Sequence, residues 1–193
     1  YFNPEYEIYT RYKVGDTEKE GLSSPIVGRM TEDKDGNLWI CTEGGGVNVY
    51  NRKNNTYRWY RHEEGRNSIS HNNVKAIYYD RTEEIMWIGT HLGGLNKLDL
   101  RTTRFAVYRM KAGDPTTLPS DIVRDIVPYE DKLIIATQNG VCLFNPATGT
   151  CEHLFKDTKE GRNIGMVASL YIDKDETLWV LPASTSSRPA KPA

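Results

Sequence analysis

The side chains best suited to bind a small polar ligand recur in two sets of short loops. The first set is Glu43-Gly44-Gly45-Gly46, His91-Leu92-Gly93-Gly94 and Gln138-Asn139-Gly140, and the second includes His71-Asn72-Asn73 and Ser120-Asp121. Between them, carboxylates, amides and imidazoles donate and accept hydrogen bonds, as the hydroxyl groups of a sugar require. The candidate ligand-binding residues are therefore Glu43, His71, Asn72, His91, Asp121 and Gln138.

Catalysis has little support among the same residues. The four histidines are scattered, and Ser70-His71 are only neighbours in sequence, which does not give a nucleophile beside its base. The chain has no Gly-x-Ser-x-Gly segment and no His-x-x-x-His pair. We therefore expect no catalytic residue and no enzymatic activity in this region.

A metal ion or cofactor is not expected either. Asp33-Lys34-Asp35-Gly36-Asn37 resembles the start of a calcium loop, but Gly44 stands where that loop needs a glutamate, so a hairpin turn is favoured. The glycine pairs do not open a helix after a strand, so they do not form a phosphate-binding loop. The glycines are interpreted as turn residues with positive φ.

These loops are carried by an internal repeat. A tryptophan, or Ile134 in its place, recurs at positions 39, 87, 134 and 179, a spacing of 45 to 48 residues. Each unit holds four short alternating runs separated by turn residues, which in the second unit are 75–80, 85–90, 94–99 and 104–109. Alternation with period two predicts strands, and four strands in such a unit are typical of a β-propeller blade. Trp39, Trp87 and Trp179 are expected in the cores of their blades.

We therefore predict an all-β chain that is a segment of a β-propeller with four-stranded antiparallel blades. The predicted units are the outer half of a preceding blade (1–14), three complete blades (15–62, 63–110 and 111–156), the inner half of a further blade (157–181) and a tail (182–193). A fragment of a larger propeller is favoured. A closed four-bladed ring and an eight-bladed ring in which two chains exchange their halves are the alternatives. Open blade edges would favour self-association.

The polar loops should lie at one rim of such a fold. The loop between the second and third strands shares a face with the loop that links one blade to the next, so both sets would gather there. Arg29, Lys75 and Arg124 begin or nearly begin the inner strands and are expected to point to the mouth of the axial channel.

The repeat resembles the "regulator propeller" repeat of bacterial two-component systems. The resemblance rests on Leu38-Trp39-Ile40-Cys41-Thr42-Glu43-Gly44-Gly45-Gly46-Val47-Asn48, on its counterpart 86–96, and on the preceding Leu22-Ser23 and Ile69-Ser70 segments. It implies the periplasmic sensor region of a hybrid two-component histidine kinase of the Bacteroides type. It also implies an oligosaccharide or similar ligand, a signal relayed by rearrangement of two protomers, and a kinase in another part of the parent protein.

The bulk composition agrees with such a domain. The chain has 25 basic and 26 acidic residues, so no global field favours nucleic acid. No apolar run approaches about 18 residues and no signal peptide opens the sequence. A membrane contact is therefore expected only through parts of the parent protein outside these residues.

Three cysteines have no metal-ligand spacing. Cys41 takes the place of Gly89 and Ala136 in the other units and is interpreted as a small buried side chain. Cys142 and Cys151 are expected on adjacent strands of one hairpin. A cross-strand disulfide between them would be possible in an oxidising compartment, but a diagonal placement disfavours it.

Two other functions stay open. A protein-interaction scaffold would bind no small ligand and would contact its partner through the outer strands or the rim. A propeller glycosidase or lyase would turn over a polysaccharide, since the fold itself does not exclude an enzyme.

Overall fold

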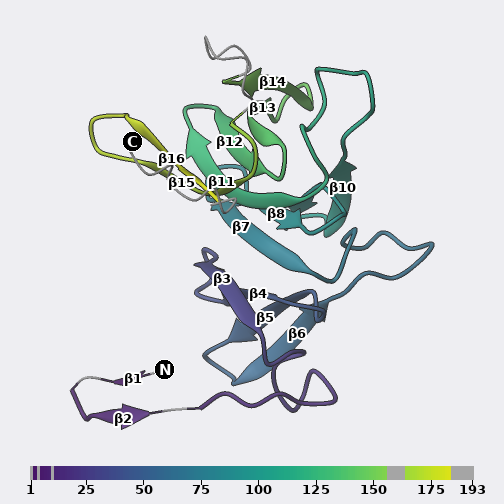
Figure 1. Cartoon of the computed structure of the whole chain (residues 1–193). Coiled ribbons are helices and arrows are strands. Elements are labelled where there is room, and N and C mark those ends of the chain that lie inside the picture. The colour runs from purple at the N-terminus through teal and green to yellow at the C-terminus, as the bar shows by residue number, and fades with distance from the viewer. Residues whose placement is uncertain (1, 4, 10, 156–163, 184–193) are drawn as a thin grey trace, which may run out of the picture.

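The structure is a computed structural model that describes residues 2–3, 5–9, 11–155 and 164–183. All regular structure in this part of the chain is β-strand (Figure 1). Among the described residues, no helix is long and apolar enough to cross a membrane. Residues 156–163, which include the loop Arg162-Asn163 before the predicted inner half blade, lie outside the described residues, as does most of the segment interpreted as a tail.

Three four-stranded antiparallel sheets form the body of the protein, and in each the strands pair in sequence order. The first blade consists of β3 (Val27–Glu32), β4 (Leu38–Thr42), β5 (Val47–Asn51) and β6 (Thr56–Tyr60). The second consists of β7 (Val74–Asp80), β8 (Ile85–Thr90), β9 (Leu95–Asp99) and β10 (Arg104–Tyr108). The third consists of β11 (Val123–Tyr129), β12 (Lys132–Thr137), β13 (Gly140–Asn145) and β14 (Thr150–Leu154). The predicted all-β propeller blades are confirmed.

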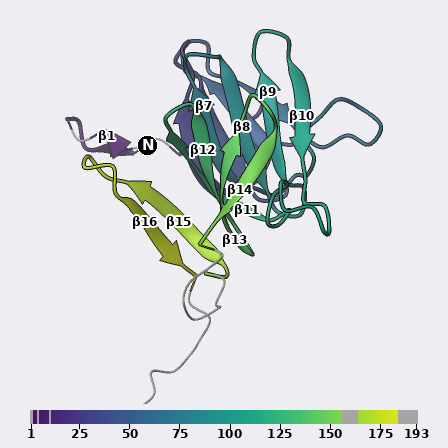
Figure 2. The ribbon, with the colours of Figure 1, turned by 90° about the horizontal axis from the view of Figure 1, so that it is seen from above.

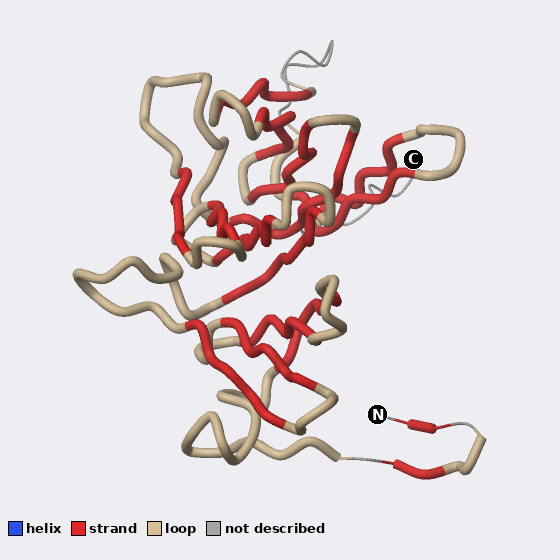
Figure 3. Tube along the Cα trace, turned by 180° about the vertical axis from the view of Figure 1, so that it is seen from behind, coloured by secondary structure: helices blue, strands red, loops and turns tan. Residues whose placement is uncertain are grey.

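Two further hairpins flank the blades. β1 (Phe2–Asn3) pairs only with β2 (Ile8–Tyr9), and β15 (Val167–Ile172) pairs only with β16 (Leu178–Pro182). The first hairpin stands apart in Figure 3, and Figure 2 shows the second beside the blades. The two do not join into one sheet, so the four-bladed ring considered above is not formed. β16 also continues to Pro182, one residue into the segment interpreted as a tail.

The inner strands β3, β7, β11 and β15 are neighbours in space. Each has a register shift near its start, between Val27 and Met30, Val74 and Ala76, Val123 and Asp125, and Val167 and Ser169. A bulge bends a strand and re-aims its side chains. The same bulge therefore recurs at the start of each inner strand. This is the end of the strand that lies nearest the polar loops.

The hydrophobic core lies between blades. Trp39, Val47 and Met86 belong to a buried cluster that joins the first and second blades. Trp87 and Phe144 belong to the cluster that joins the second and third. The alternating residues of each blade thus cover the face of the next one, which removes their apolar surface from water.

Trp179 corrects one prediction. It occupies the same repeat position as Trp39 and Trp87, which are 3% and 1% exposed, but Trp179 is 60% exposed. The physical reason is that its hairpin has a blade on one side only. The third blade covers Val167 and Leu170, and Trp179 lies on the strand pair that no further blade covers in this structure.

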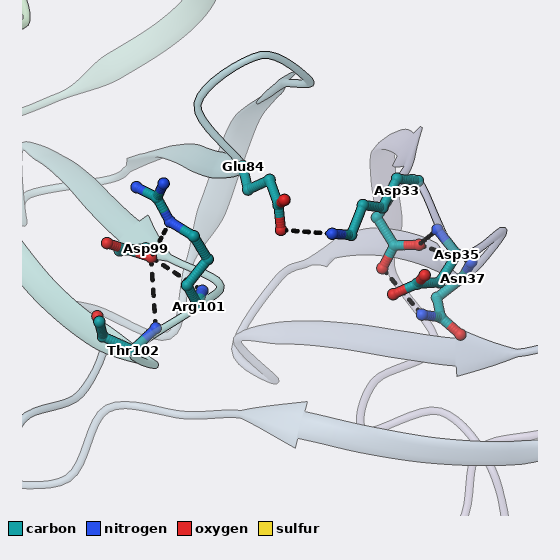
Figure 4. A network of polar contacts seen from close by, with 8 residues as sticks. Asp33, Asp35, Asn37, Glu84, Asp99, Arg101 and Thr102 are labelled. Atoms are coloured by element: carbon teal, nitrogen blue, oxygen red, sulfur yellow. Dashed lines mark hydrogen bonds and ion pairs between the residues drawn. The ribbon is translucent and has the colours of Figure 1, made fainter.

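The turn at Asp33 holds the tryptophan of the first blade. The Oδ2 atom of Asp33 accepts a hydrogen bond from Nε1 of Trp39 at 2.8 Å. Its Oδ1 atom accepts the backbone N–H groups of Asp35 and Asn37 at 2.9 Å, and Figure 4 shows these three residues together. Asp173 repeats the pattern with Trp179 at 2.7 Å. In both places the carboxylate closes a hairpin turn, as the sequence predicted at Asp33, and anchors an indole that is buried at Trp39 and exposed at Trp179.

This turn predicts a pH dependence of stability. Burial raises the pKa of Asp33, but the hydrogen bonds donated by Trp39, Asn37 and Asp35 outweigh it and hold the pKa below its ordinary value. A lowered folded pKa contributes stability above the unfolded pKa, and that contribution is lost as the pH falls through the folded pKa.

Asp33→Asn should therefore lose less stability than the wild type between about pH 5 and pH 2. Urea unfolding at a series of pH values measures this difference, with Asp131→Asn, on an exposed turn, as the matched control. An equal loss for wild type and Asp33→Asn across this range would contradict the assignment.

Candidate functional site

The two sets of polar loops meet on one face. Three backbone hydrogen bonds, 2.9 to 3.0 Å long, connect the two sets. The N–H of Glu43 donates to the carbonyl of Ile26, that of His91 to the carbonyl of Asn73, and that of Gln138 to the carbonyl of Ile122. Each bond joins the loop between the second and third strands of a blade to the segment that enters the same blade. We call the face formed by residues 23–26, 43–46, 71–75, 91–94, 120–124 and 138–140 the polar rim.

The polar rim is also linked from one blade to the next. Gly46 N–H donates to the carbonyl of Asn72, and Gly94 N–H donates to the carbonyl of Asp121, both at 2.8 Å. Both glycines have positive φ, 78° and 76°. A side chain at either position would meet the carbonyl of Tyr60 or Tyr108, so the glycines serve both turn geometry and close approach.

A repeated polar clasp fixes the base of the rim. Ser23 N–H donates to Oδ1 of Asn48 at 2.7 Å, and the Asn48 amide donates back to the Ser23 hydroxyl. Ser70 and Asn96 repeat the pair, with Ser70 N–H to Asn96 Oδ1 at 2.9 Å. Asn48 and Asn96 are fully buried, so the clasp satisfies amides that would otherwise be costly to bury.

Gly45 and Gly93 are needed for a different reason from the one predicted. They do not have positive φ, but a Cβ at Gly45 would overlap the side chains of Ser23 and Thr42. At Gly93 it would overlap Ser70 and Thr90. Gly45 and Gly93, which directly precede the positive-φ glycines Gly46 and Gly94, thus leave room for the clasp serine.

Two of the expected basic residues contact candidate binding residues on the rim. Lys75 Nζ lies 3.5 Å from Oε1 of Glu43, in a partly exposed pair that spans the first and second blades. Arg124 donates to Oε1 of Gln138 from two nitrogens, at 2.7 and 3.3 Å. Exposed ion pairs contribute little to stability, about 0–1 kcal/mol, so the Lys75–Glu43 pair leaves both groups available to a ligand.

Arg29 does not join the rim. Its NH2 group donates to Oδ2 of Asp125 at 2.6 Å and to the hydroxyl of Ser169 at 3.0 Å. Asp125 and Ser169 sit just after the bulges of β11 and β15, so Arg29 reaches across the axis from the first blade to the third. Arg29 was predicted to point to the mouth of the axial channel; the structure instead places it in an axial cluster with Asp125 and Ser169 that sequence reasoning missed.

His71 and His91, the two histidines of the polar rim, lie close together. Nδ1 of His71 accepts the N–H of Asn73 at 3.0 Å, which places the ring proton of neutral His71 on Nε2. Burial, and then the charges of His91 and His62, hold the pKa of His71 below its ordinary value. His71 is therefore a neutral donor through Nε2 at neutral pH, and His91 is its neighbour on the second blade.

Asn72 and Asp121 are used within the protein. Oδ1 of Asn72 accepts the N–H of His62, and Oδ1 of Asp121 accepts the N–H of Met110, both at 2.7 Å. Each of these side chains therefore holds the end of the preceding outer strand against the next blade. The structure thus brings together Glu43, His71, His91 and Gln138 as rim groups, and it gives Asn72 and Asp121 a tying role.

A large hollow lies on the first blade and meets the polar rim at Pro25. It has a volume of about 1420 Å³ and is lined by Val27, Met30, Leu38, Ile40 and Tyr50 of the first blade, together with Tyr9 and residues 11–14. It is the open face of the first blade, on the side opposite the second blade. Its apolar lining matches the faces that other blades cover, so it is an uncovered packing surface.

Comparison with known proteins supports the repeat. Residues 21–44 match the family model described as two component regulator propeller. These residues contain the clasp serine Ser23, the turn aspartate Asp33, Trp39 and Glu43. The resemblance drawn from the sequence is confirmed. No curated protein matches the chain.

Solved structures with the same fold include two from B. thetaiotaomicron. The extracellular domain assigned to the hybrid two-component system BT3049 is 25% identical, with a TM-score of 0.73 over 88% of this chain and 24% of that one. The one assigned to BT4673 is 25% identical, with a TM-score of 0.70 over 88% of this chain and 23% of that one. Saccharomyces cerevisiae Sqt1, 19% identical with a TM-score of 0.54 over 79% of this chain and 40% of that one, shares the fold alone. The chain thus spans about a quarter of the length of the two bacterial domains.

Proposed function

We propose that this chain, which carries a two-component regulator propeller repeat, is part of the periplasmic sensor region of a hybrid two-component receptor that binds an oligosaccharide at the polar rim. The fold it shares with extracellular domains of such systems supports the receptor assignment. The parent receptor would carry the membrane span and the kinase, and this region would have no catalytic role.

The observation that carries the proposal is the polar rim itself. The rim carries hydrogen-bond donors and acceptors of different kinds on loops that backbone hydrogen bonds hold in place. These groups are His71, His91, the pair Glu43–Lys75 and the pair Gln138–Arg124. Binding residues concentrate on loops positioned by a rigid scaffold. Mixed donors and acceptors suit the hydroxyl groups of a sugar, since each hydroxyl can both donate and accept.

The described residues support binding better than catalysis. None of their hydrogen bonds joins a serine or cysteine to a histidine, which is the geometry that nucleophilic catalysis requires. A sensor needs only differential affinity, because a ligand shifts an equilibrium by as much as it prefers one arrangement of the protomers over the other.

Thermal unfolding of the complete ectodomain that carries this chain, against a panel of oligosaccharides, tests the proposal. A ligand that binds only the folded state stabilises it by about 2.7 kcal/mol at a hundred times its Kd, so one glycan should raise the Tm. His91→Ala and Glu43→Ala should remove the shift. Asp131→Ala, on the exposed turn at the opposite ends of the third blade's strands, should keep it.

The outcomes separate the three functions. A shift that both rim variants abolish supports the sensor. A shift that survives both variants would place the ligand elsewhere and contradict the rim. No shift with any glycan would favour the protein-interaction scaffold. Turnover of a glycan, lost on mutation of rim carboxylates or histidines, would favour a glycosidase or lyase.

A further inference from the structure

Two buried cysteines lie against each other in the third blade. Cys142 on β13 and Cys151 on β14 are 0% and 7% exposed, and they are free thiols in this structure. Cys142 pairs with His153 and Cys151 pairs with Phe144, so the cysteines are diagonal, as the sequence predicted. Their Sγ atoms are nevertheless only 3.2 Å apart. The diagonal placement therefore does not keep the sulfur atoms apart.

The internal repeat shows that both cysteines are departures from the blade pattern. Cys142 pairs with Ile135 at the position where Asn48 pairs with Ile40 in the first blade and Asn96 with Ile88 in the second. Cys151 pairs with Phe144 where the other blades have an aromatic residue, Tyr57 or Phe105. The asparagine and the aromatic residue are thus both replaced by cysteine, in the same blade and in contact.

The same blade lacks the polar clasp. In the first two blades the asparagine accepts the N–H of a serine, but the equivalent residue before the third blade is Pro119, which has no N–H to donate. The N–H of Cys151 donates to the carbonyl of Thr116 in the entering loop at 2.7 Å, just as the N–H of Phe105 donates to Asn67 in the second blade. A covalent link from Cys142 to Cys151 would therefore tie the entering loop to β13, as the clasp does elsewhere.

We propose that Cys142 and Cys151 form a disulfide that replaces the polar clasp in the third blade. A disulfide needs an Sγ–Sγ distance of about 2.05 Å, so the sulfur atoms must approach by about 1 Å. The compartment in which it would form rests on the proposed function, because disulfides persist in the periplasm and are rare in the cytosol. Cys41 stays a thiol because it has no partner: it lies in the core cluster between the first and second blades, whereas Cys142 and Cys151 lie in the cluster between the second and third.

Oxidation can begin at Cys151. A hollow of about 160 Å³, lined by Tyr108, Leu118, Gly149 and Cys151 among others, opens beside this residue, whereas Cys142 has no exposed surface. The Cys151 thiolate attacks a small disulfide such as oxidised glutathione and releases one reduced glutathione. The Cys142 thiolate then displaces the second glutathione from the mixed disulfide. Two thiol protons and two electrons leave the protein, and one glutathione disulfide becomes two thiols.

Peptide mapping of the whole chain tests the proposal directly. The chain is equilibrated with oxidised and reduced glutathione, alkylated in denaturant without reductant, digested and analysed by mass spectrometry. We expect one linked peptide, two hydrogens lighter than the sum of its two thiol peptides, that contains Cys142 and Cys151. The Cys41 peptide should be fully alkylated. Alkylation of all three cysteines, or a link that involves Cys41, would overturn the proposal.

A stability measurement on folded protein provides the second readout. Reduction should lower the Tm of the oxidised wild type by roughly 5–10 °C, and it should not change the Tm of Cys142→Ala. Cys41→Ala, the matched control, should keep the response to reductant. Equal Tm values for oxidised and reduced wild type would contradict a bridge that replaces the clasp.

These readouts use no glycan, so they fail independently of the sensor proposal. A disulfide in a protein that no glycan stabilises would leave this inference intact and remove the proposed ligand. A glycan response in a protein with three free thiols would support the proposed ligand and remove the disulfide.

Discussion

Trp87→Ala is expected to lower the free energy of unfolding by about 3–5 kcal/mol, the range observed when a fully buried tryptophan or phenylalanine is truncated. The Trp87 side chain is 1% exposed and lies between the second and third blades. Its ring meets Phe144 edge-on, with centroids 5.5 Å apart, and Tyr108 at 6.2 Å. Truncation would leave a cavity at a contact that the two blades share, and neither sheet can close it alone.

Trp179→Ala is the matched control for this prediction. The residue has the same repeat position, but it is 60% exposed. Its loss should cost less than about 1 kcal/mol, as is usual for exposed positions. Urea unfolding of both variants, followed by circular dichroism, measures the two values. Equal losses would show that the blades are not packed through Trp87.

The second large effect is expected at Asp125. Its side chain is 1% exposed, and its Oδ2 atom accepts hydrogen bonds from Arg29, from the Ser169 hydroxyl and from the N–H of Leu170. Asp125→Ala leaves these donors without their acceptor, and a buried donor without a partner is costly. We expect a loss of about 2–4 kcal/mol in urea unfolding.

Arg29→Ala should cost much less than Asp125→Ala. The Arg29 side chain is 44% exposed, so water can solvate much of its charge, and Asp125 keeps its other donors when the guanidinium is removed. A double-mutant cycle between the two residues isolates their coupling. A loss at Arg29 that equals the loss at Asp125 would contradict this asymmetry.

The fold could be predicted closely from local signals. In the second blade the predicted strands 75–80, 85–90, 94–99 and 104–109 differ from the observed β7 to β10 by at most one residue at either end. This succeeded because strand alternation and turn residues are properties of neighbouring positions. In the predicted outer half of a preceding blade (1–14), the described residues form only the two-residue strands Phe2–Asn3 and Ile8–Tyr9.

The candidate site could be predicted only in part. Sequence reasoning placed Glu43, His91 and Gln138 on loops that do meet at one rim. It had no means to see that Asn72 and Asp121 turn their oxygen atoms toward the N–H groups of His62 and Met110. A polar side chain in a loop gives the same sequence signal whether its partner is a ligand or the backbone of another strand.

The sequence by itself determined the blade, its four strands, its turns and its repeated tryptophan, because each depends on residues that are close along the chain. The tertiary structure decided which of the repeated residues are buried and which polar groups have partners. Trp87 is buried and Trp179 is exposed, because only Trp87 has a blade on each side. Arg29, Asp125 and Ser169 form one axial cluster although Arg29 is 96 residues from Asp125 and 140 from Ser169. Contacts at such separations arise only when the inner strands of several blades meet at a common axis.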